Sequence, residues 1–221
     1  MKDVPILYED DELIVVNKPS GLPVQGGEGI AVCLLDVLER QTGAKVYPVH
    51  RLDRDTAGVL AVARSSAAAA ALSKLITSGA LVKEYLAITV GAPPDRGGVI
   101  RSPAGKPGAE KAADTAYRVL SVAGGLALLS LTLGTGRTHQ IRIHLASIGC
   151  PIVADDKHGD FSANRELRRS FGARKLQLLS SSLEFPVAGR REKFTVPLPA
   201  HMADLAERAG LQLPSGHRVD S

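Results

Sequence analysis

One aspartate of this chain lies among cationic residues directly before an apolar run. His50, Arg51, Asp53 and Arg54 come first, and the run at residues 59–63 follows them. Such a run predicts a buried strand, so we expect Asp53 on a polar loop held by a rigid element. A nearby cation keeps a carboxylate ionised and able to act as nucleophile or base. Taken alone, however, this stretch favours a simple ion pair over catalysis.

A second stretch, residues 133–145, opens on a glycine-rich turn and becomes helical. Ile141, Leu145 and Ile148 recur at helical spacing and predict a core-facing stripe, and the Gly-Cys-Pro that follows predicts the end of the helix. Arg142 falls at the edge of this stripe, where a guanidinium can reach a carboxylate while its stem packs on apolar neighbours. A merely solvated helix would not explain a cation beside the buried face.

Together the two stretches resemble the RluA-type pseudouridine synthases. His-Arg-Leu-Asp begins at His50, and Gly-Arg-Thr-His-Gln-Ile-Arg begins about eighty residues later at Gly136, in the order of the family. The resemblance spans roughly residues 6–210. Shorter segments in the same order resemble the family's opening hairpin, its lysine-x-tyrosine strand and its closing segment, at residues 11–21, 83–85 and 197–199.

The resemblance implies isomerisation of uridine to pseudouridine within RNA, without cofactor or metal. It makes Asp53 the indispensable carboxylate, which either attacks the sugar or removes a sugar proton; the sequence leaves both routes open. Arg142 matches the arginine that pairs with this aspartate, and Tyr85 matches the tyrosine that stacks on the target base and assists proton removal. Arg51 matches an arginine that fills the space vacated by the flipped base.

Other residues of the two motifs are expected to contact RNA or substrate. His50, Arg137 and His139 would shape or line the site, and Arg54 and Thr56 belong to the same expected set. No spacing among the six histidines resembles a zinc site.

The chain departs from the family pattern at several positions near the expected cleft. Ala57 stands where serine is usual, Ala154 and His158 replace a glycine and a tyrosine, and Leu179-Ser180 replaces histidine-alanine. None of these changes removes the aspartate, arginine or tyrosine, so activity is still expected, although target choice or loop geometry could differ.

Composition agrees with one soluble domain. The 221 residues, 44% of them apolar, predict a single catalytic domain over 1–221, with a core at about 6–210 and a short tail at 211–221. No run could span a bilayer and no signal segment is visible, so a cytoplasmic protein without the N-terminal S4 module of many relatives is expected. Cys33 and Cys150 are expected to be free thiols.

The pattern of elements predicts an α+β fold without repeats. The resemblance implies a mixed, mainly antiparallel central sheet flanked by helices around a catalytic cleft. Residues 92–112, rich in Gly, Pro and charge, are expected to form a loop. The expected elements are a hairpin at 6–17, a strand at 59–63, helices at 31–41 and from Ser65 to Gly79, and strands at 81–90, 113–120 and 126–133.

RNA is the expected partner, with ribosomal RNA of the large subunit favoured over transfer RNA and a monomer as the default. Aromatic residues make up only 4% of the chain, which argues against base-stacking platforms and for recognition by shape and charge. The alternatives are a non-catalytic RNA-binding protein of the same fold and a carboxylate-dependent hydrolase of a nucleoside or glycoside. Basic residues cluster at Arg165, Arg168, Arg169, Arg174 and Lys175, and again at Arg190, Arg191 and Lys193, where phosphate contact is expected.

Overall fold

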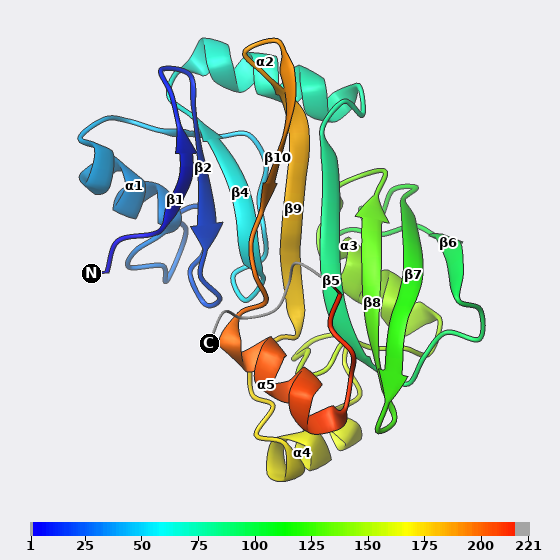
Figure 1. Ribbon diagram of the computed structural model, residues 1–221. Coiled ribbons are helices and arrows are strands. Elements are labelled where there is room, and N and C mark those ends of the chain that lie inside the picture. Colours follow the sequence, from blue (N-terminus) through cyan, green and yellow to red (C-terminus); the bar gives the residue numbers. More distant parts are fainter. Residues whose placement is uncertain (1, 215–221) are drawn as a thin grey trace. The chain divides into compact units, whose positions relative to one another are not determined.

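The computed structural model describes residues 2–214, and in it the chain forms two compact units (Figure 1). Residues 2–83 and 180–196 belong to the first unit, and residues 84–179 and 197–214 to the second. Within the described part of the chain, no helix combines the length and the apolar character that a bilayer crossing requires.

The first unit contains a sheet and two helices. Its strands run in the order β1-β2-β4-β9, with β3 also paired to β4 and β10 to β9, and the pairs β1–β2, β2–β4, β3–β4 and β9–β10 are antiparallel. The elements in chain order are β1 (Ile6–Glu9), β2 (Leu13–Lys18), α1 (Leu34–Thr42), β3 (Tyr47–Pro48), β4 (Ala57–Ala63), α2 (Ser66–Thr77), most of β9 (Leu178–Val187) and β10 (Arg190–Thr195).

Strand β4 confirms the strand predicted from the apolar run at 59–63. All seven of its residues are buried, as an apolar strand is when both faces of its sheet are covered. It lies between β2 and β9, so the loop that precedes it, with Asp53, is attached to the centre of this unit's sheet. The hairpin expected at 6–17 is formed by β1 and β2.

Both helices of this unit were predicted from sequence, and one begins later than expected. In α2 the Ser65 hydroxyl accepts a hydrogen bond from the Ala68 N–H at 3.1 Å, which is the predicted cap. The helix expected from residue 31 begins only at Leu34, because the Asp36 carboxylate accepts the Cys33 N–H at 2.8 Å and fixes Cys33 as the residue before the first turn.

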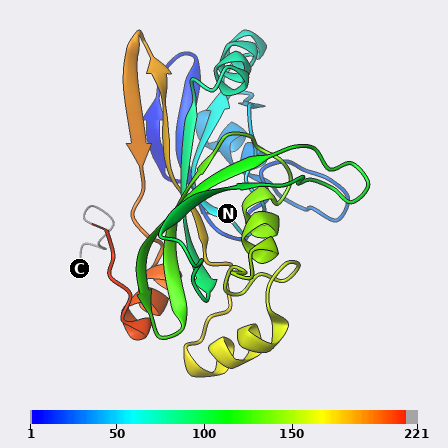
Figure 2. The ribbon, with the colours of Figure 1, turned by 90° about the vertical axis from the view of Figure 1, so that its right-hand side faces the viewer.

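The second unit contains four strands in the order β5-β8-β7-β6, and the pairs β5–β8, β7–β8 and β6–β7 are antiparallel. Figure 2 shows α3 and α5 on opposite sides of β7 and β8. The elements are most of β5 (Val82–Val90), β6 (Gly97–Arg101), β7 (Asp114–Ala123), β8 (Leu126–Leu133), α3 (Gln140–Ser147), α4 (Phe161–Ser170) and α5 (Ala200–Ala209).

The prediction of a continuous loop over 92–112 is wrong, because strand β6 lies inside it and pairs with β7. Its glycines are strand glycines: a Cβ on Gly98 would lie only 3.0 to 3.1 Å from atoms of the Tyr117 side chain. Glycine is used here to make room for a cross-strand ring and not to make a turn. The strand predicted at 113–120 extends to Ala123, and the strand at 126–133 is confirmed as β8.

The fold is therefore of the α+β class, with a mixed, mainly antiparallel sheet, and both features were predicted from the sequence. Helix α4 and helix α5 had no counterpart among the elements predicted from sequence, nor did β9 and β10.

Gly58, at the start of β4, has less room for a side chain than any other glycine described in the first unit. Its φ is +116°, and a Cβ there would lie 2.1 Å from the backbone oxygen of Ser180 on β9. Gly58→Ala should therefore lower the free energy of unfolding by about 3–5 kcal/mol, from backbone strain and from forcing two strands apart. Urea denaturation measures this loss. Gly79→Ala, at φ +74° with open space around it, should cost only about 1–2 kcal/mol, and equal losses would contradict the steric account.

Candidate active site

Asp53 lies in the turn that leads into β4. Its backbone carbonyl accepts a hydrogen bond from the Thr56 N–H at 3.2 Å, so the four residues 53–56 form a tight turn. Asp53 is half-buried and Thr56 is buried, whereas Arg51 and Arg54 are exposed. The structure thus brings these four predicted site residues together on one short segment of the first unit.

Lys18, the last residue of β2, ties this turn to the preceding hairpin. Its side chain is fully buried, and Nζ donates to the carbonyl oxygens of Pro19, Leu22 and Arg54 at 3.0, 2.8 and 3.0 Å. Burial lowers the pKa of Lys18 to about 7. Three carbonyl acceptors nevertheless need the three N–H donors of the ammonium form, so Lys18 is a charged cross-link between the two segments.

Two further residues of the same segment hold the backbone beside Asp53. The Ser20 hydroxyl donates to the Asp55 carbonyl at 2.8 Å, and the Gly21 N–H donates to the Arg54 carbonyl at 2.9 Å. The Asn-Lys-Pro-Ser-Gly segment was noted in the sequence only as part of an opening hairpin. Its structural role is to clamp the turn that carries the candidate catalytic carboxylate.

Removing the buried ammonium should loosen this clamp. We expect Lys18→Met to lower the free energy of unfolding by about 2–4 kcal/mol, because three carbonyls lose their donor while the aliphatic stem is kept. Chemical denaturation measures the change. Lys74→Met, on the exposed surface of α2, is the matched control and should change stability by less than about 0.5 kcal/mol. A Lys18→Met protein as stable as the wild type would refute the role of Lys18 as a cross-link.

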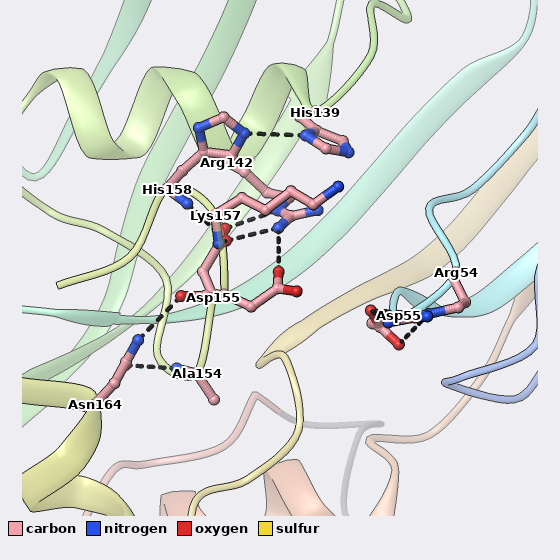
Figure 3. A network of polar contacts seen from close by, with 10 residues as sticks. Arg54, Asp55, His139, Arg142, Ala154, Asp155, Lys157, His158 and Asn164 are labelled. Atoms are coloured by element: carbon pink, nitrogen blue, oxygen red, sulfur yellow. Dashed lines mark hydrogen bonds and ion pairs between the residues drawn. The ribbon is translucent and has the colours of Figure 1, made fainter. Parts of the chain in front are cut away.

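His50 and Arg54 are both engaged within the first unit. The Nε2 atom of His50 accepts the Ala61 N–H of β4 at 3.2 Å, and burial together with the charge of Lys83 lowers the pKa of His50 to about 3. A neutral, accepting imidazole fits a residue that supports β4. The Arg54 guanidinium pairs with Asp55, with Nη2 and Oδ2 3.1 Å apart (Figure 3).

Arg142, in α3 of the second unit, forms a buried two-pronged ion pair that sequence analysis missed. Its Nε donates to Oδ2 of Asp155 at 2.7 Å and its Nη2 to Oδ1 at 2.6 Å, while Nη2 also donates to Asp156 at 3.0 Å (Figure 3). Arg142 and Asp155 have only 4% and 1% of their surface exposed. Arg142 therefore reaches inward to the carboxylate of Asp155, whereas its expected pairing with Asp53 stays a prediction.

Asp155 is held ionised by several donors. Burial alone would raise the pKa of its carboxyl, but the hydrogen bonds from Arg142 and from the N–H groups of His158 and Lys157 hold that pKa below its usual value. The guanidinium of Arg142 is therefore fixed in one orientation by a partner that is ionised at neutral pH. Its neighbour Asp156 is mostly exposed.

The segment that carries Asp155 has an unusual backbone, which Asn164 of α4 supports. Ala154 has a φ of +59°, a left-handed conformation that explains why glycine is usual at this position. The Asn164 Oδ1 accepts the Ala154 N–H at 2.8 Å, and its Nδ2 donates to the Asp155 carbonyl at 3.1 Å (Figure 3). The Asn164 side chain thus holds both the left-handed backbone at Ala154 and the backbone of Asp155, the partner of Arg142.

His139 and His158, one expected from the motif and one a departure from it, lie together. The Nδ1 of His139 and the Nε2 of His158 are 3.0 Å apart, so one ring donates to the other (Figure 3). His139 also has a positive φ of 54° directly before α3. The pair joins the start of α3 to the segment that carries Asp155.

The glycine-rich turn before α3 is organised by Gln140. Its Oε1 accepts from the Thr135 hydroxyl at 2.7 Å and from the Arg137 N–H at 3.0 Å, and its Nε2 donates to the Asp114 carbonyl at 2.9 Å. Gln140 is buried, whereas the Arg137 side chain is exposed. The turn therefore presents Arg137 to solvent on a fixed backbone.

Tyr85 lies on β5, opposite Leu131 of β8, and is 6% exposed. Asp53, His50, Arg51, Arg54 and Thr56 belong to the first unit, and Tyr85, Arg137, His139 and Arg142 to the second.

Cys33 and Cys150 are buried free thiols, as expected. Among residues 2–214, no three His, Cys, Asp or Glu side chains gather closely enough to hold a metal ion.

Comparisons with known proteins assign the chain to a family. Residues 12–147 match the family model described as RNA pseudouridylate synthase. Ribosomal large subunit pseudouridine synthase C of Haemophilus ducreyi is 33% identical over 213 residues, which cover 89% of this chain and 66% of that protein. The protein of the same name from Escherichia coli is 34% identical over 214 residues, covering 88% and 66%. This chain thus spans about two thirds of the length of these bacterial relatives.

A solved structure agrees in fold over nearly the whole chain. Human RNA Pseudouridylate Synthase Domain Containing 4 superposes with a TM-score of 0.83 at 30% identity, and the match covers 96% of this chain and 95% of that one.

Proposed function

Since this chain belongs to the RNA pseudouridylate synthase family, we propose that it isomerises uridine to pseudouridine in structured RNA, with Asp53 as its essential carboxylate. In this reaction the N-glycosidic bond breaks, the uracil turns, and a bond to its carbon 5 is made. The main structural support for this role of Asp53 is the turn before β4, where Lys18, Ser20 and Gly21 form hydrogen bonds with the backbone next to Asp53. A carboxylate on a turn fixed in this way is pre-positioned for a reacting atom.

Asp53 acts either by attacking the sugar or by removing a sugar proton, and both routes need the ionised form. Arg142 is proposed to pair with the reacting carboxylate and orient it, and its own guanidinium is fixed by Asp155. Tyr85 stacks on the target base and assists the final proton removal. Since the uracil is released and recaptured in one pocket, the proposal includes no cofactor and no metal.

The remaining motif residues divide by their exposure. Arg51, Arg54 and Arg137 are exposed, which suits contact with RNA, and Arg51 would fill the space left by the flipped base. His50, Thr56 and His139 would shape the substrate pocket through the backbone they support.

Ribosomal RNA of the large subunit is the proposed substrate, ahead of transfer RNA. The support is that the bacterial relatives reported above are named for that subunit. A monomer acting in the cytoplasm is proposed along with it.

The direct test is turnover by the purified protein on three substrates: ribosomal RNA, transfer RNA and free uridine. After digestion of the RNA, chromatography of the nucleosides separates pseudouridine from uridine. We expect new pseudouridine in ribosomal RNA, less in transfer RNA, and no product from free uridine. Uracil released from free uridine would instead favour a nucleoside hydrolase, and RNA binding without product would favour a non-catalytic RNA-binding protein.

A further inference from the structure

Helix α4 of the second unit presents one outward face of cations and an aromatic ring. Phe161, Arg165, Arg168 and Arg169 are spaced at i, i+4, i+7 and i+8, so they share one side of the helix. All four residues are exposed, Phe161 to 62%. An aromatic ring exposed to this extent on a cationic face has no role in the core of this unit.

The opposite side of α4 fixes the helix in place. Leu167 is buried, and the Asn164 amide binds the backbone at Ala154 and Asp155. The Asp160 carboxylate caps the first turn by accepting the N–H groups of Ser162 and Ala163, each at 2.9 Å. The arginine face is therefore held outward by a well-anchored helix.

The charges on this face are not neutralised by any carboxylate of the described residues. Among residues 2–214, no ion pair joins Arg165, Arg168 or Arg169 to a carboxylate. Glu166 is the one acidic residue within α4, and Arg174 and Lys175 follow the helix as further exposed cations. The basic cluster on β10, at residues 190–193, differs in its pairing, because its Arg191 forms an ion pair with Glu184.

We propose that this face of α4 is an RNA-binding surface, in which the three arginines contact phosphates and Phe161 stacks on an unpaired base. The proposal rests on the proposed function and names the surface that RNA contacts. Unpaired guanidinium groups on a rigid helix suit phosphates, and an exposed ring beside them suits an unstacked base of a loop. Neither feature alone would distinguish RNA from another polyanion; together they favour RNA.

The surface is also joined to the Arg142 network, since Asn164 of the same helix brackets the segment that holds Asp155. RNA bound to α4 would therefore be held at a fixed position relative to Arg142 of the candidate active site. This is the geometry expected of contacts that position a substrate without reading its sequence.

The test is the salt dependence of binding of a fluorescent RNA stem–loop with a uridine-rich loop. Replacing Arg165, Arg168 and Arg169 by Gln should weaken binding about tenfold or more and reduce the slope of log affinity against log salt by about 2. The comparison variant replaces Arg190, Arg191 and Lys193 of β10 by Gln, which removes the same charge from the other cluster where the sequence predicts phosphate contact. Because Arg191 is already paired with Glu184, this cluster should contribute less to the salt dependence than the α4 face does. That variant should keep a slope within about 1 of the wild type.

Equal changes in both triple variants, or no change in the α4 variant, would overturn the proposal. Thermal melting checks that each variant is folded. Binding is measured without turnover, so an α4 surface that binds RNA in a protein that makes no pseudouridine would refute the proposed function alone. Pseudouridine formation with an unaffected α4 variant would refute the surface alone.

Phe161 provides an independent arm of the test. Phe161→Ala should weaken binding of the stem–loop by about 5- to 100-fold and leave binding of a fully paired duplex nearly unchanged, because stacking needs an unpaired base. Equal effects on the two RNAs would overturn the stacking role.

Discussion

Asp53→Asn should abolish isomerisation, lowering turnover by about 10⁴-fold or more, while folding and RNA binding are largely preserved. The amide keeps the shape of the carboxylate but can neither attack the sugar nor remove its proton. The clamp on this turn acts through backbone groups of Arg54 and Asp55, which the substitution leaves in place. Pseudouridine formed in a single-turnover assay on ribosomal RNA is the measurement.

Asp55→Asn is the matched control for this experiment. Asp55 lies two residues further along the same turn, and its carboxylate pairs with the exposed Arg54 at the surface. Losing that pair should cost at most about 1 kcal/mol of stability and leave turnover within severalfold of the wild type. Substantial turnover by Asp53→Asn, or an equal loss in Asp55→Asn, would show that Asp53 is not the essential carboxylate.

Asp155→Ala should strongly destabilise the second unit, lowering the free energy of unfolding by about 3–5 kcal/mol. It leaves the Arg142 guanidinium buried without its two-pronged partner, and removing one member of a buried pair costs the desolvation of the other. It also removes the acceptor for two backbone N–H groups. Urea denaturation of the variant and the wild type at neutral pH measures the difference.

Asp156→Ala is the control, because Asp156 contacts the same guanidinium from an exposed position and should cost about 1 kcal/mol or less. The pH dependence gives a second check. The pKa of Asp155 is lowered in the folded protein, so its contribution is complete above the ordinary value of 3.8 and is lost as pH falls through the lowered folded value. The difference in the free energy of unfolding between the wild type and Asp155→Ala should therefore become smaller in acid. A difference that grows in acid would contradict this account.

Elements with strong local signals were predictable from the sequence. The alanine block and Ser65 predict α2 because both helix propensity and the cap are local properties. The apolar run predicts β4 because burial on both faces leaves no alternation to read. The motif around Asp53 also predicts the position of the turn, since a polar segment must precede a buried strand.

Features that depend on tertiary contacts were not predictable. Strand β6 was missed because its glycines signal a loop locally, whereas their purpose is to make room for Tyr117 across the sheet. Asp155 was missed because its pairing with Arg142 spans thirteen residues and depends on the left-handed backbone at Ala154. The role of Lys18 could not be read either, since its acceptors are backbone carbonyls that carry no sequence signal.

The most direct test of the central claim is pseudouridine mapping of total RNA from cells with and without this gene, by selective chemical labelling and sequencing. We predict that deletion removes one or a few sites, in ribosomal RNA of the large subunit, and that the wild-type chain restores them while the Asp53→Asn chain does not. An unchanged map, or restoration by Asp53→Asn, would contradict the account.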